Sequence, residues 1–346
     1  MLMRIGALNV PVRRAIKFNL KALFANGEQG FWNDPQDLSA MFQDSADTTP
    51  AVLGQPVGKI LDKSGNENHA TQVTTSKKPI LKRQPTSGIR NVVGDSEDNT
   101  TLLWTKSRVT VNTASITETT SFGVHTLSPT TTIPNLLVGD TCTVSCDVRQ
   151  ISGSRRALLY LAGSFVGRFA NFNFDTKNIA TSAGVSAGYI DLGGGVYKLW
   201  LTSQSMNDGS GLAGIRITDN DTAAFREYTG DGISTIGVTN FQFEKGALTD
   251  YQKAIGGYDV YESGYNQVYW LDYDGVDDAL VSTNPDLGAN ATRAMATIGG
   301  AVIEQGLTLG ANQTLNTDSL GLILINRALT ADELTAITSF YNEMVA

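Results

Sequence analysis

The sequence contains few of the residues that build metal sites and nucleophilic active sites. Its 346 residues include only two cysteines and two histidines. Structural zinc sites need four Cys or His ligands at matched spacings, so this composition argues against one. His125 lies in a polar stretch without a visible triad partner, and His69 follows a Ser-Gly-Asn turn that we expect it to cap or pack against. The composition therefore gives no support to triad or zinc chemistry.

The two cysteines are not placed to form a disulfide. Cys142 and Cys146 lie four residues apart in the alternating run 141–148. On an extended strand this spacing corresponds to roughly 13 Å, which exceeds the Cα separation that a disulfide spans. We expect both to be buried free thiols that pack as small hydrophobic side chains, so nothing demands an oxidising compartment.

Long apolar runs are also missing. No stretch approaches the 18 or more residues of a membrane span, and no apolar segment of a secretory signal follows the basic N-terminal residues. The sequence therefore predicts synthesis in the cytoplasm and no membrane insertion. Its formal net charge of −8 makes the chain as a whole a poor partner for nucleic-acid phosphates.

The N-terminal segment differs from this acidic average, because its first 27 residues carry five cations and no carboxylate. Residues 1–22 could form an anchoring arm that becomes ordered on an acidic partner surface. Alternatively, residues 16–24 could be an edge strand or a helix with solvated lysines, and contact with DNA is a third interpretation. The cations are Arg4, Arg13, Arg14, Lys17 and Lys21.

The sequence is rich in glycine, threonine, serine and asparagine, with turn signals between short alternating runs. Asp-Pro, Gly-Asn and Ser-Gly pairs mark turns between residues 29 and 73. From about residue 91 to 254, alternating runs such as 157–161 and 196–202 recur at roughly ten-residue spacing, which is typical of a β-sandwich. The glycine triplet 193–195 lacks the Lys-Ser/Thr of a phosphate loop and predicts a hairpin turn.

The C-terminal segment breaks the β pattern. Thr330 and Glu333 have the spacing of a capping box, and the apolar residues that follow fall on one helical stripe. The sequence predicts a helix over about 331–345 that packs against a sheet. The stripe consists of Leu334, Ile337, Tyr341 and Met344.

One domain is expected to interrupt another. The chain exceeds the roughly 250–300 residues beyond which a single core stops growing. Residues 60–70 read as though their continuation had been moved downstream to residues 269–278. Nested β-rich modules of this kind indicate a binding or structural protein rather than an enzyme.

The segments that flank the intervening region include LFANGEQGFWNDP (23–35), MFQD (41–44), GQPVG (54–58), DKSGN (62–66), DVYESG (259–264), DGVDD (274–278) and INRALTADEL (325–334). They resemble a family of virion proteins of tailed bacteriophages and prophages that contain a laminin-G/concanavalin-A-like sandwich. The resemblance begins near residue 23 and resumes after residue 258. It is specific for fold and phage origin.

The intervening region contains the segments SED (96–98), WTK (104–106), GGVY (194–197), YTGDG (228–232) and FQFEKGALTDY (241–251). With these segments it is similar to a jelly-roll module of carbohydrate-binding type that is common in phage tail and fibre proteins. Together the resemblances imply an all-β fold of two nested β-sandwiches plus a C-terminal helix. Residues 23–88 and 257–346 would form the outer domain, and residues 89–256 the inserted jelly roll.

The outer domain departs from its relatives in one respect. Only residues 279–320 lie between the DGVDD segment and the terminal helix, where relatives have several strands. Either the sandwich is abbreviated, or a neighbouring chain supplies strands to an open edge, since unpaired edges invite pairing. The second alternative predicts a homo-oligomer.

Catalytic and metal signals are sparse. Concanavalin-A-like glycosidases carry a Glu-x-Asp-x-x-Glu strand that places acid and nucleophile on one face, and this spacing is missing, so we expect no enzyme. An Asp-Gly hairpin explains the carboxylates of 272–278 more simply than acid/base chemistry.

The resemblance requires no cofactor. Calcium remains possible where acidic turns converge, because it prefers several oxygen ligands; the candidate ligands are Asp62, Asn66, Asp274 and Asp277.

Glycan binding would need exposed aromatic faces beside polar groups, and a sandwich core would use the same residue types. Sequence alone does not separate the two roles. The candidates are Trp104, Phe172, Tyr197 and Trp200, with Trp270 as a further possibility.

The leading interpretation is a non-enzymatic protein of the virion, in the tail, a fibre or the capsid, that contacts other virion proteins and binds host-surface polysaccharide or lipopolysaccharide. A purely structural or decoration role without glycan binding is the alternative. An enzyme that degrades capsular polysaccharide is a third.

Overall fold

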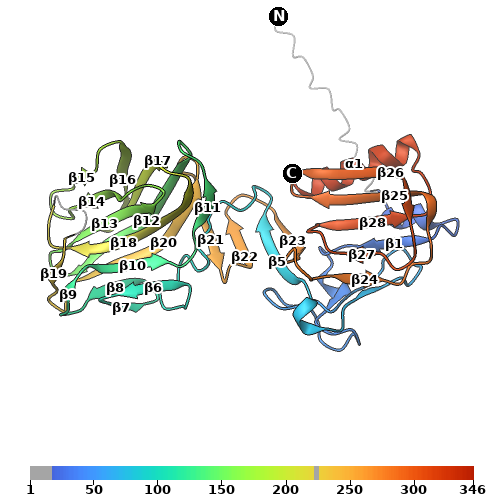
Figure 1. Cartoon of the computed structure of the whole chain (residues 1–346), viewed down its shortest axis with the longest axis horizontal. Coiled ribbons are helices and arrows are strands. Elements are labelled where there is room, and N and C mark those ends of the chain that lie inside the picture. Colours follow the sequence, from blue (N-terminus) through green and yellow to red (C-terminus); the bar gives the residue numbers. More distant parts are fainter. Residues whose placement is uncertain (1–17, 222–225) are drawn as a thin grey trace, which may run out of the picture. The chain divides into compact units, whose positions relative to one another are not determined.

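The computed structural model describes residues 18–221 and 226–346, which form an all-β sandwich fold with one α-helix near the C-terminal end (Figure 1). Backbone contacts divide the chain into two units. The first comprises the described residues up to 50 together with 57–79 and 273–346, and the second comprises those of 51–56 and 80–272. The second unit thus interrupts the first in sequence.

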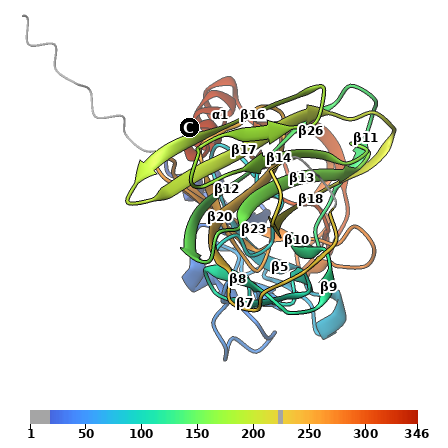
Figure 2. The same ribbon diagram turned by 90° about the vertical axis from the view of Figure 1, so that its left-hand side faces the viewer.

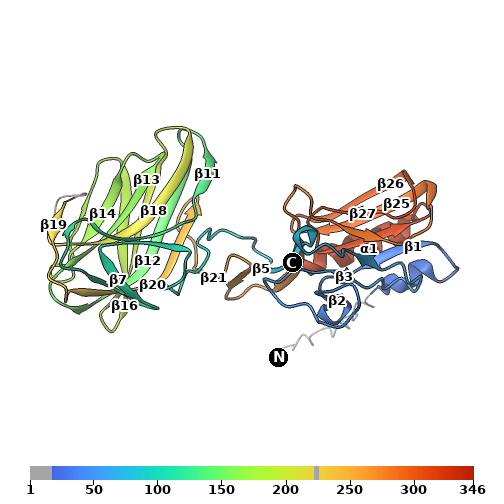
Figure 3. The ribbon, with the colours of Figure 1, turned by 60° about the horizontal axis from the view of Figure 1, so that its bottom comes forward.

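The first unit is built from two sheets, in the strand orders β1-β28-β25-β26 and β2-β3-β4-β24-β27 (Figure 3). Strand β1 pairs antiparallel with β28, and β4 pairs antiparallel with β24. Segments from before and after the insertion therefore share both sheets. The strands are β1 (Gly30–Asn33), β2 (Met41–Phe42), β3 (Lys59–Ile60), β4 (Ala70–Thr71), β24 (Leu280–Ser282), β25 (Gly288–Thr297), β26 (Gly300–Leu309), β27 (Thr314–Leu315) and β28 (Gly321–Ile325), and short 3-10 helices span Leu20–Phe24, Leu38–Ala40 and Thr75–Lys77.

Helix α1 (Ala331–Met344) confirms the predicted C-terminal helix. The Thr330 hydroxyl accepts a hydrogen bond from the Glu333 N–H at 3.3 Å, and the Glu333 carboxylate accepts one from the Thr330 N–H at 2.8 Å. This capping box satisfies N–H groups that have no partner inside the helix. Ile337 and Tyr341 are buried on the face that packs against β25 and β26, as the apolar stripe predicted.

The second unit contains a jelly-roll sandwich of two large antiparallel sheets (Figure 2). The core between the sheets includes both cysteines, which are free thiols as predicted. Burial raises the pKa of Cys142 to about 12 and that of Cys146 as well, so both thiols stay protonated and packed. The first sheet contains β6 (Trp104–Ser107), β10 (His125–Pro129), β11 (Ile133–Leu136), β13 (Arg156–Gly163), β14 (Arg168–Phe172), β15 (Ile179–Thr181) and β18 (Gly209–Thr218).

The other large sheet has six strands in the order β16-β17-β12-β20-β8-β7, which Figure 2 shows from top to bottom. Its edge hairpin turns at Gly194 and Gly195, whose φ values of +61° and +77° suit a two-residue turn. This confirms the predicted hairpin. The strands are β7 (Val109–Asn112), β8 (Ser115–Glu118), β12 (Thr141–Ser152), β16 (Val185–Gly193), β17 (Val196–Gln204) and β20 (Thr235–Lys245), and a separate pair is formed by β9 (Phe122–Gly123) and β19 (Tyr228–Thr229).

A small four-stranded sheet also belongs to the second unit. Its strand order is β21-β22-β5-β23, so the segment that enters the unit pairs with segments that leave it. For this reason the boundaries of the unit lie at 79/80 and 272/273, whereas the sequence had suggested 88/89 and 256/257. The strands are β5 (Ile80–Pro85), β21 (Gln252–Ile255), β22 (Asp259–Glu262) and β23 (Gln267–Asp272).

Candidate ligand-binding site

The six-stranded sheet has one face toward the core and one face outward, because successive strand residues point to opposite sides. On β12 and β17 the apolar partners Val144, Cys146 and Leu199 face the core. The residues between them form the outward face, and they are mostly polar. Across these two strands the outward pairs are Ser145 with Trp200, Asp147 with Lys198, and Arg149 with Val196.

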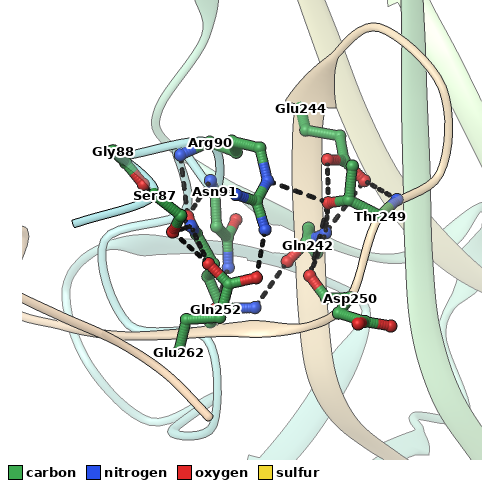
Figure 4. A network of polar contacts seen from close by, with 10 residues as sticks. All are labelled: Ser87, Gly88, Arg90, Asn91, Gln242, Glu244, Thr249, Asp250, Gln252 and Glu262. Atoms are coloured by element: carbon green, nitrogen blue, oxygen red, sulfur yellow. Dashed lines mark hydrogen bonds and ion pairs between the residues drawn. The ribbon is translucent and has the colours of Figure 1, made fainter. Parts of the chain in front are cut away.

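One end of this outward face is covered by the segments at which the jelly roll begins and ends (Figure 4). Gln242 and Glu244 of β20 are fully buried there. Glu244 accepts hydrogen bonds from the N–H and the hydroxyl of Thr249 at 3.1 and 2.5 Å. The Gln242 side-chain oxygen accepts from the N–H of Gln252 at 2.8 Å.

The same network ties the beginning of the jelly roll to strand β22. The Arg90 guanidinium pairs with the buried Glu262 carboxylate and donates to the Thr249 hydroxyl at 3.1 Å (Figure 4). Gln252 donates to Glu262 at 2.9 Å and to the Gly88 carbonyl at 2.8 Å. Burial opposes ionisation of Glu262, but the bonds from Arg90 and Gln252 outweigh it and hold the pKa of Glu262 below its usual range. These groups satisfy one another and leave little to bind a ligand.

A pocket of about 230 Å³ opens elsewhere on the outward face, between β12 and its neighbours on both sides. We call it the Asp147 pocket. It has a polar centre and small or apolar walls, which is the usual make-up of a ligand site. Its lining residues are Ala114, Asp147, Val148, Arg149, Val196, Gly237 and Thr239.

Asp147 supplies the polar centre of the pocket. Its side chain is buried, with the residue 7 % exposed. The Oδ2 atom accepts a hydrogen bond from Asn240 Nδ2 at 2.7 Å, whereas the buried Oδ1 atom has no hydrogen-bond partner among the residues that the structure describes. Burial raises the pKa of Asp147, although the Asn240 bond and the nearby Lys198 charge oppose this. A buried acceptor that lines a pocket without a partner is a candidate ligand contact.

Asn240 reaches Asp147 because β20 contains a bulge. Ser145 pairs with Gln242 and Asp147 with Thr239, so β20 has one extra residue between these pairs. Asn240 has a φ of +52°, a left-handed conformation that asparagine tolerates better than most residues. Bulges redirect side chains and often occur beside functional sites.

Two glycines on the outward face make room for larger neighbours. A Cβ atom on Gly188 would lie 2.9–3.0 Å from the Trp200 indole, so the half-buried ring lies across β16. A Cβ atom on Gly237 would lie 2.6 Å from Arg149 Cγ, so the arginine stem lies across β20 beside the pocket. Neither glycine has a positive φ, so neither is required by the backbone conformation. Each instead leaves room for a neighbouring side chain.

The structure separates the aromatic candidates. Trp104, Phe172 and Tyr197 are 4 %, 1 % and 8 % exposed and belong to the sandwich core, so they cannot offer a ring face to a ligand. Trp200 alone of the four main candidates lies on the outward face. Trp270 lies on the small sheet beside Lys82, 5.5 Å from its amine. Alternation along β17 could have distinguished Trp200 from Tyr197, because they differ by an odd number of positions.

The calcium candidates do not form one site among the described residues. The Asp62 carboxylate already accepts from the N–H groups of Trp32, Ser64 and Asn68, each at 2.9 Å. Asn66 donates its amide to the Glu28 and Gly30 carbonyls. Asp62 is thus occupied in organising a turn, at which its own N–H donates to His69 Nδ1 at 3.0 Å, as expected for that histidine.

Asp274 and Asp277 lie in a different cluster, with Asp278, in which carboxylate oxygens come within 4.8 Å of one another. Asp274 Oδ1 accepts three backbone N–H groups of its own turn, and these bonds lower its pKa. The predicted Asp-Gly hairpin is wrong, because β23 pairs with β5 and β24 pairs with β4 and β27. The segment is an exposed turn.

His125 has no exposed surface, and its Nδ1 lies 2.7 Å from the Arg108 carbonyl. Its ring packs against that of Tyr228, with the two ring centroids 4.7 Å apart. The imidazole is therefore a packed side chain inside the sandwich.

The basic arm is largely outside the described residues, which begin at residue 18; Arg4, Arg13, Arg14 and Lys17 all precede this point. Lys21 is exposed on the short helix Leu20–Phe24, while Leu20 and Leu23 of that helix are buried. The packed part of the chain thus begins before residue 23. No helix within the described residues is long and apolar enough to cross a membrane.

No family model and no curated protein matches the chain. Among solved structures, the adhesin domain of Epf from Streptococcus pyogenes is similar over 84 % of this chain and 79 % of that chain, with 8 % identity and a TM-score of 0.22. At this TM-score the similarity carries no argument about fold or function.

Proposed function

We propose that this chain is a non-enzymatic protein of a tailed-phage or prophage virion, and that its second unit attaches to host-surface glycan through the Asp147 pocket. One observation carries the glycan part: Asp147 lines a pocket on the outward face of a sheet, and one of its carboxylate oxygens is buried without a partner among the described residues. The half-buried Trp200 lies on the same face of the sheet. The virion part rests on the resemblance of the flanking and inserted segments to phage proteins.

A chain of sugars fits the chemistry of this surface. A hydroxyl group of one unit donates to Asp147, and the C–H face of a neighbouring unit packs on the Trp200 ring, which lies over β16 outside the pocket lining. The volume of about 230 Å³ is below the roughly 300–1,000 Å³ of pockets for drug-sized ligands, so it suits one small polar unit of a longer chain.

The pocket favours binding over hydrolysis. Glycoside hydrolysis uses two carboxyl groups on opposite sides of the scissile bond. Asp147 is the only carboxylate that lines this pocket among the described residues. A single carboxylate held by Asn240 orients a ligand without completing that catalytic pair.

The chain would reach its place in the tail, fibre or capsid by contacts with other virion proteins and with copies of itself, and residues 1–22 would anchor it. Deletion of residues 1–17 tests this part, because it removes four of the five cations and leaves the packed helix Leu20–Phe24 in place. We expect deleted chains to be excluded from particles, and undiminished incorporation would contradict the anchor.

Glycan binding is tested with the full chain on an array of bacterial surface glycans. Trp200→Ala is expected to weaken binding at least tenfold, since truncating a stacked aromatic anchor costs about 2 kcal/mol or more. Trp270→Ala is the matched control, because that tryptophan lies on the small sheet. Equal loss in both variants would show that the outward face with Trp200 is not the glycan site. No binding by the natural chain would favour a purely structural role.

A further inference from the structure

The charges around the Asp147 pocket are unbalanced. Lys198 lies directly opposite Asp147 on β17, and Arg149 follows Asp147 on the same outward face. Neither cation forms an ion pair or a side-chain hydrogen bond with any of the described residues. Two cations therefore flank one carboxylate, in a chain whose formal net charge is −8.

The remaining charged groups near Asp147 do not restore the balance. Tyr251 lies close enough for the Asp147 charge to act on it, but burial raises the pKa of this phenol and keeps it neutral. Glu97 acts on the same tyrosine, and it is paired with Lys253. The surroundings of the pocket thus retain one excess positive charge from Arg149 and Lys198.

Arg149 is held where it could contact a ligand. Its stem lies over Gly237, and the residue lines the pocket while remaining exposed. A guanidinium presents several donors in a planar fork that matches carboxylate, phosphate and sulfate oxygens. Lys198 adds a compact second charge on the other side of Asp147.

We infer that the Asp147 pocket takes an acidic sugar unit: Asp147 Oδ1 accepts from a sugar hydroxyl, and Arg149 with Lys198 binds an anionic group on the same unit. This inference rests on the proposed function and names its ligand class. A cationic amino sugar is disfavoured by the two cations. A dense polyanion such as nucleic acid is disfavoured by the carboxylate at the centre.

Uronate, phosphate and sulfate groups share this chemistry, and the experiment separates them. The full chain is titrated with oligosaccharides that carry each group, and with the carboxyl-reduced form of the uronate oligosaccharide. We expect at least one acidic oligosaccharide to bind about tenfold or more tightly than its neutral counterpart. Its affinity should fall as the salt concentration rises from about 0.05 to about 0.5 M, because salt screens exposed charges.

Arg149→Gln and Lys198→Gln should each remove most of this preference and flatten the salt dependence. Lys245→Gln is the matched control, since this exposed cation of β20 pairs with Asp140 away from the pocket. If the natural chain bound acidic and neutral sugars equally well, and Trp200→Ala abolished this binding, the inference of an acidic ligand would be overturned. The proposed glycan-binding function would still stand. Binding of no sugar at all would overturn both.

Discussion

Asp147 destabilises the fold, since a charge in a buried position is poorly solvated and one of its oxygens has no partner in the part of the chain that the structure describes. Binding residues are often kept at such a cost, because the groups that a ligand satisfies are unsatisfied without it. A neutral side chain of the same shape should therefore improve the fold and impair the site.

Asp147→Asn is predicted to raise stability by on the order of 1 kcal/mol at pH 7, or about 2–4 °C in Tm. The sign follows from the raised pKa of Asp147 in the folded protein. Asp147 holds its proton more tightly in the folded protein than in the unfolded chain. The stability of the natural protein therefore falls as pH rises from 3.8, the pKa in the unfolded chain, through the higher pKa in the folded protein. Thermal melts of both proteins from pH 3 to pH 7 should diverge across that window. A less stable variant at pH 7 would contradict this account.

Gly188 provides a second test at a single position. A Cβ atom there would displace the Trp200 indole, but the backbone needs no positive φ and the position is on a strand. Gly188→Val should therefore change stability by less than about 1 kcal/mol, while glycan affinity falls about tenfold. Ser186→Val is the control, because Ser186 lies on the same face of β16 and is exposed. Similar losses of affinity in both variants would show that the Trp200 orientation is not what matters.

Residue types alone did not identify the site. The alternation 141–148 already placed Asp147 on the face opposite the cysteines, and the alternation 196–202 placed Lys198 and Trp200 opposite Tyr197. That these strands are neighbours, and that Asp147 therefore meets Lys198, depends on long-range pairing that no local pattern specifies. The left-handed bulge at Asn240 is equally hidden, since its sequence reads as uninterrupted strand.

At the scale of elements, the features with local causes were predicted best. The C-terminal helix was expected within one residue of its observed end, and the glycine hairpin was expected at its observed position. The Asp-Gly segment misled because a turn signal does not say which strands pair on either side of it. The unit boundaries shifted for the same reason, because β5 pairs with strands of the second unit.

Because of the capping box of helix α1, the stability of the fold changes with pH in the acid range. Arg327 and the Thr330 N–H bond the Glu333 carboxylate, and the pKa of Glu333 falls from 4.5 to about 2. This lowered pKa stabilises the fold above pH 4.5, and the contribution is lost as pH falls toward 2. Glu333→Gln should cost about 1–2 kcal/mol at pH 7 and almost nothing near pH 2. Denaturant titrations at both pH values measure the difference, and a cost that does not change with pH would refute it.

At the scale of the whole molecule, the second unit has its own core and its own polar closure. The jelly-roll core lies within residues 93–243, and the Arg90–Glu262 network joins the segments at its two ends. We therefore predict that a fragment of residues 80–272 folds alone and unfolds in one cooperative transition.

The network supplies the control for this prediction. Glu262→Ala removes the partner of Arg90 and should lower the stability of the fragment by roughly 3 kcal/mol, whereas Lys82→Ala, at a half-buried surface pair with Asp272, should cost less than about 1 kcal/mol. Circular dichroism during a urea titration measures the free energy of unfolding of the fragment and of both variants. A fragment that lacks a cooperative transition would show that the second unit depends on the first.

The pairing of Ile80 with Asp272 has a consequence for how such proteins diversify. The long segment 80–272 of the second unit begins and ends at two residues that face each other across one strand pair, roughly 5 Å apart. An interruption with ends so close makes little geometric demand on the polypeptide that hosts it. Any other domain whose termini lie at a similar distance would fit the same insertion points, so the surface that the chain presents could change by exchange of a whole insert instead of by gradual substitution.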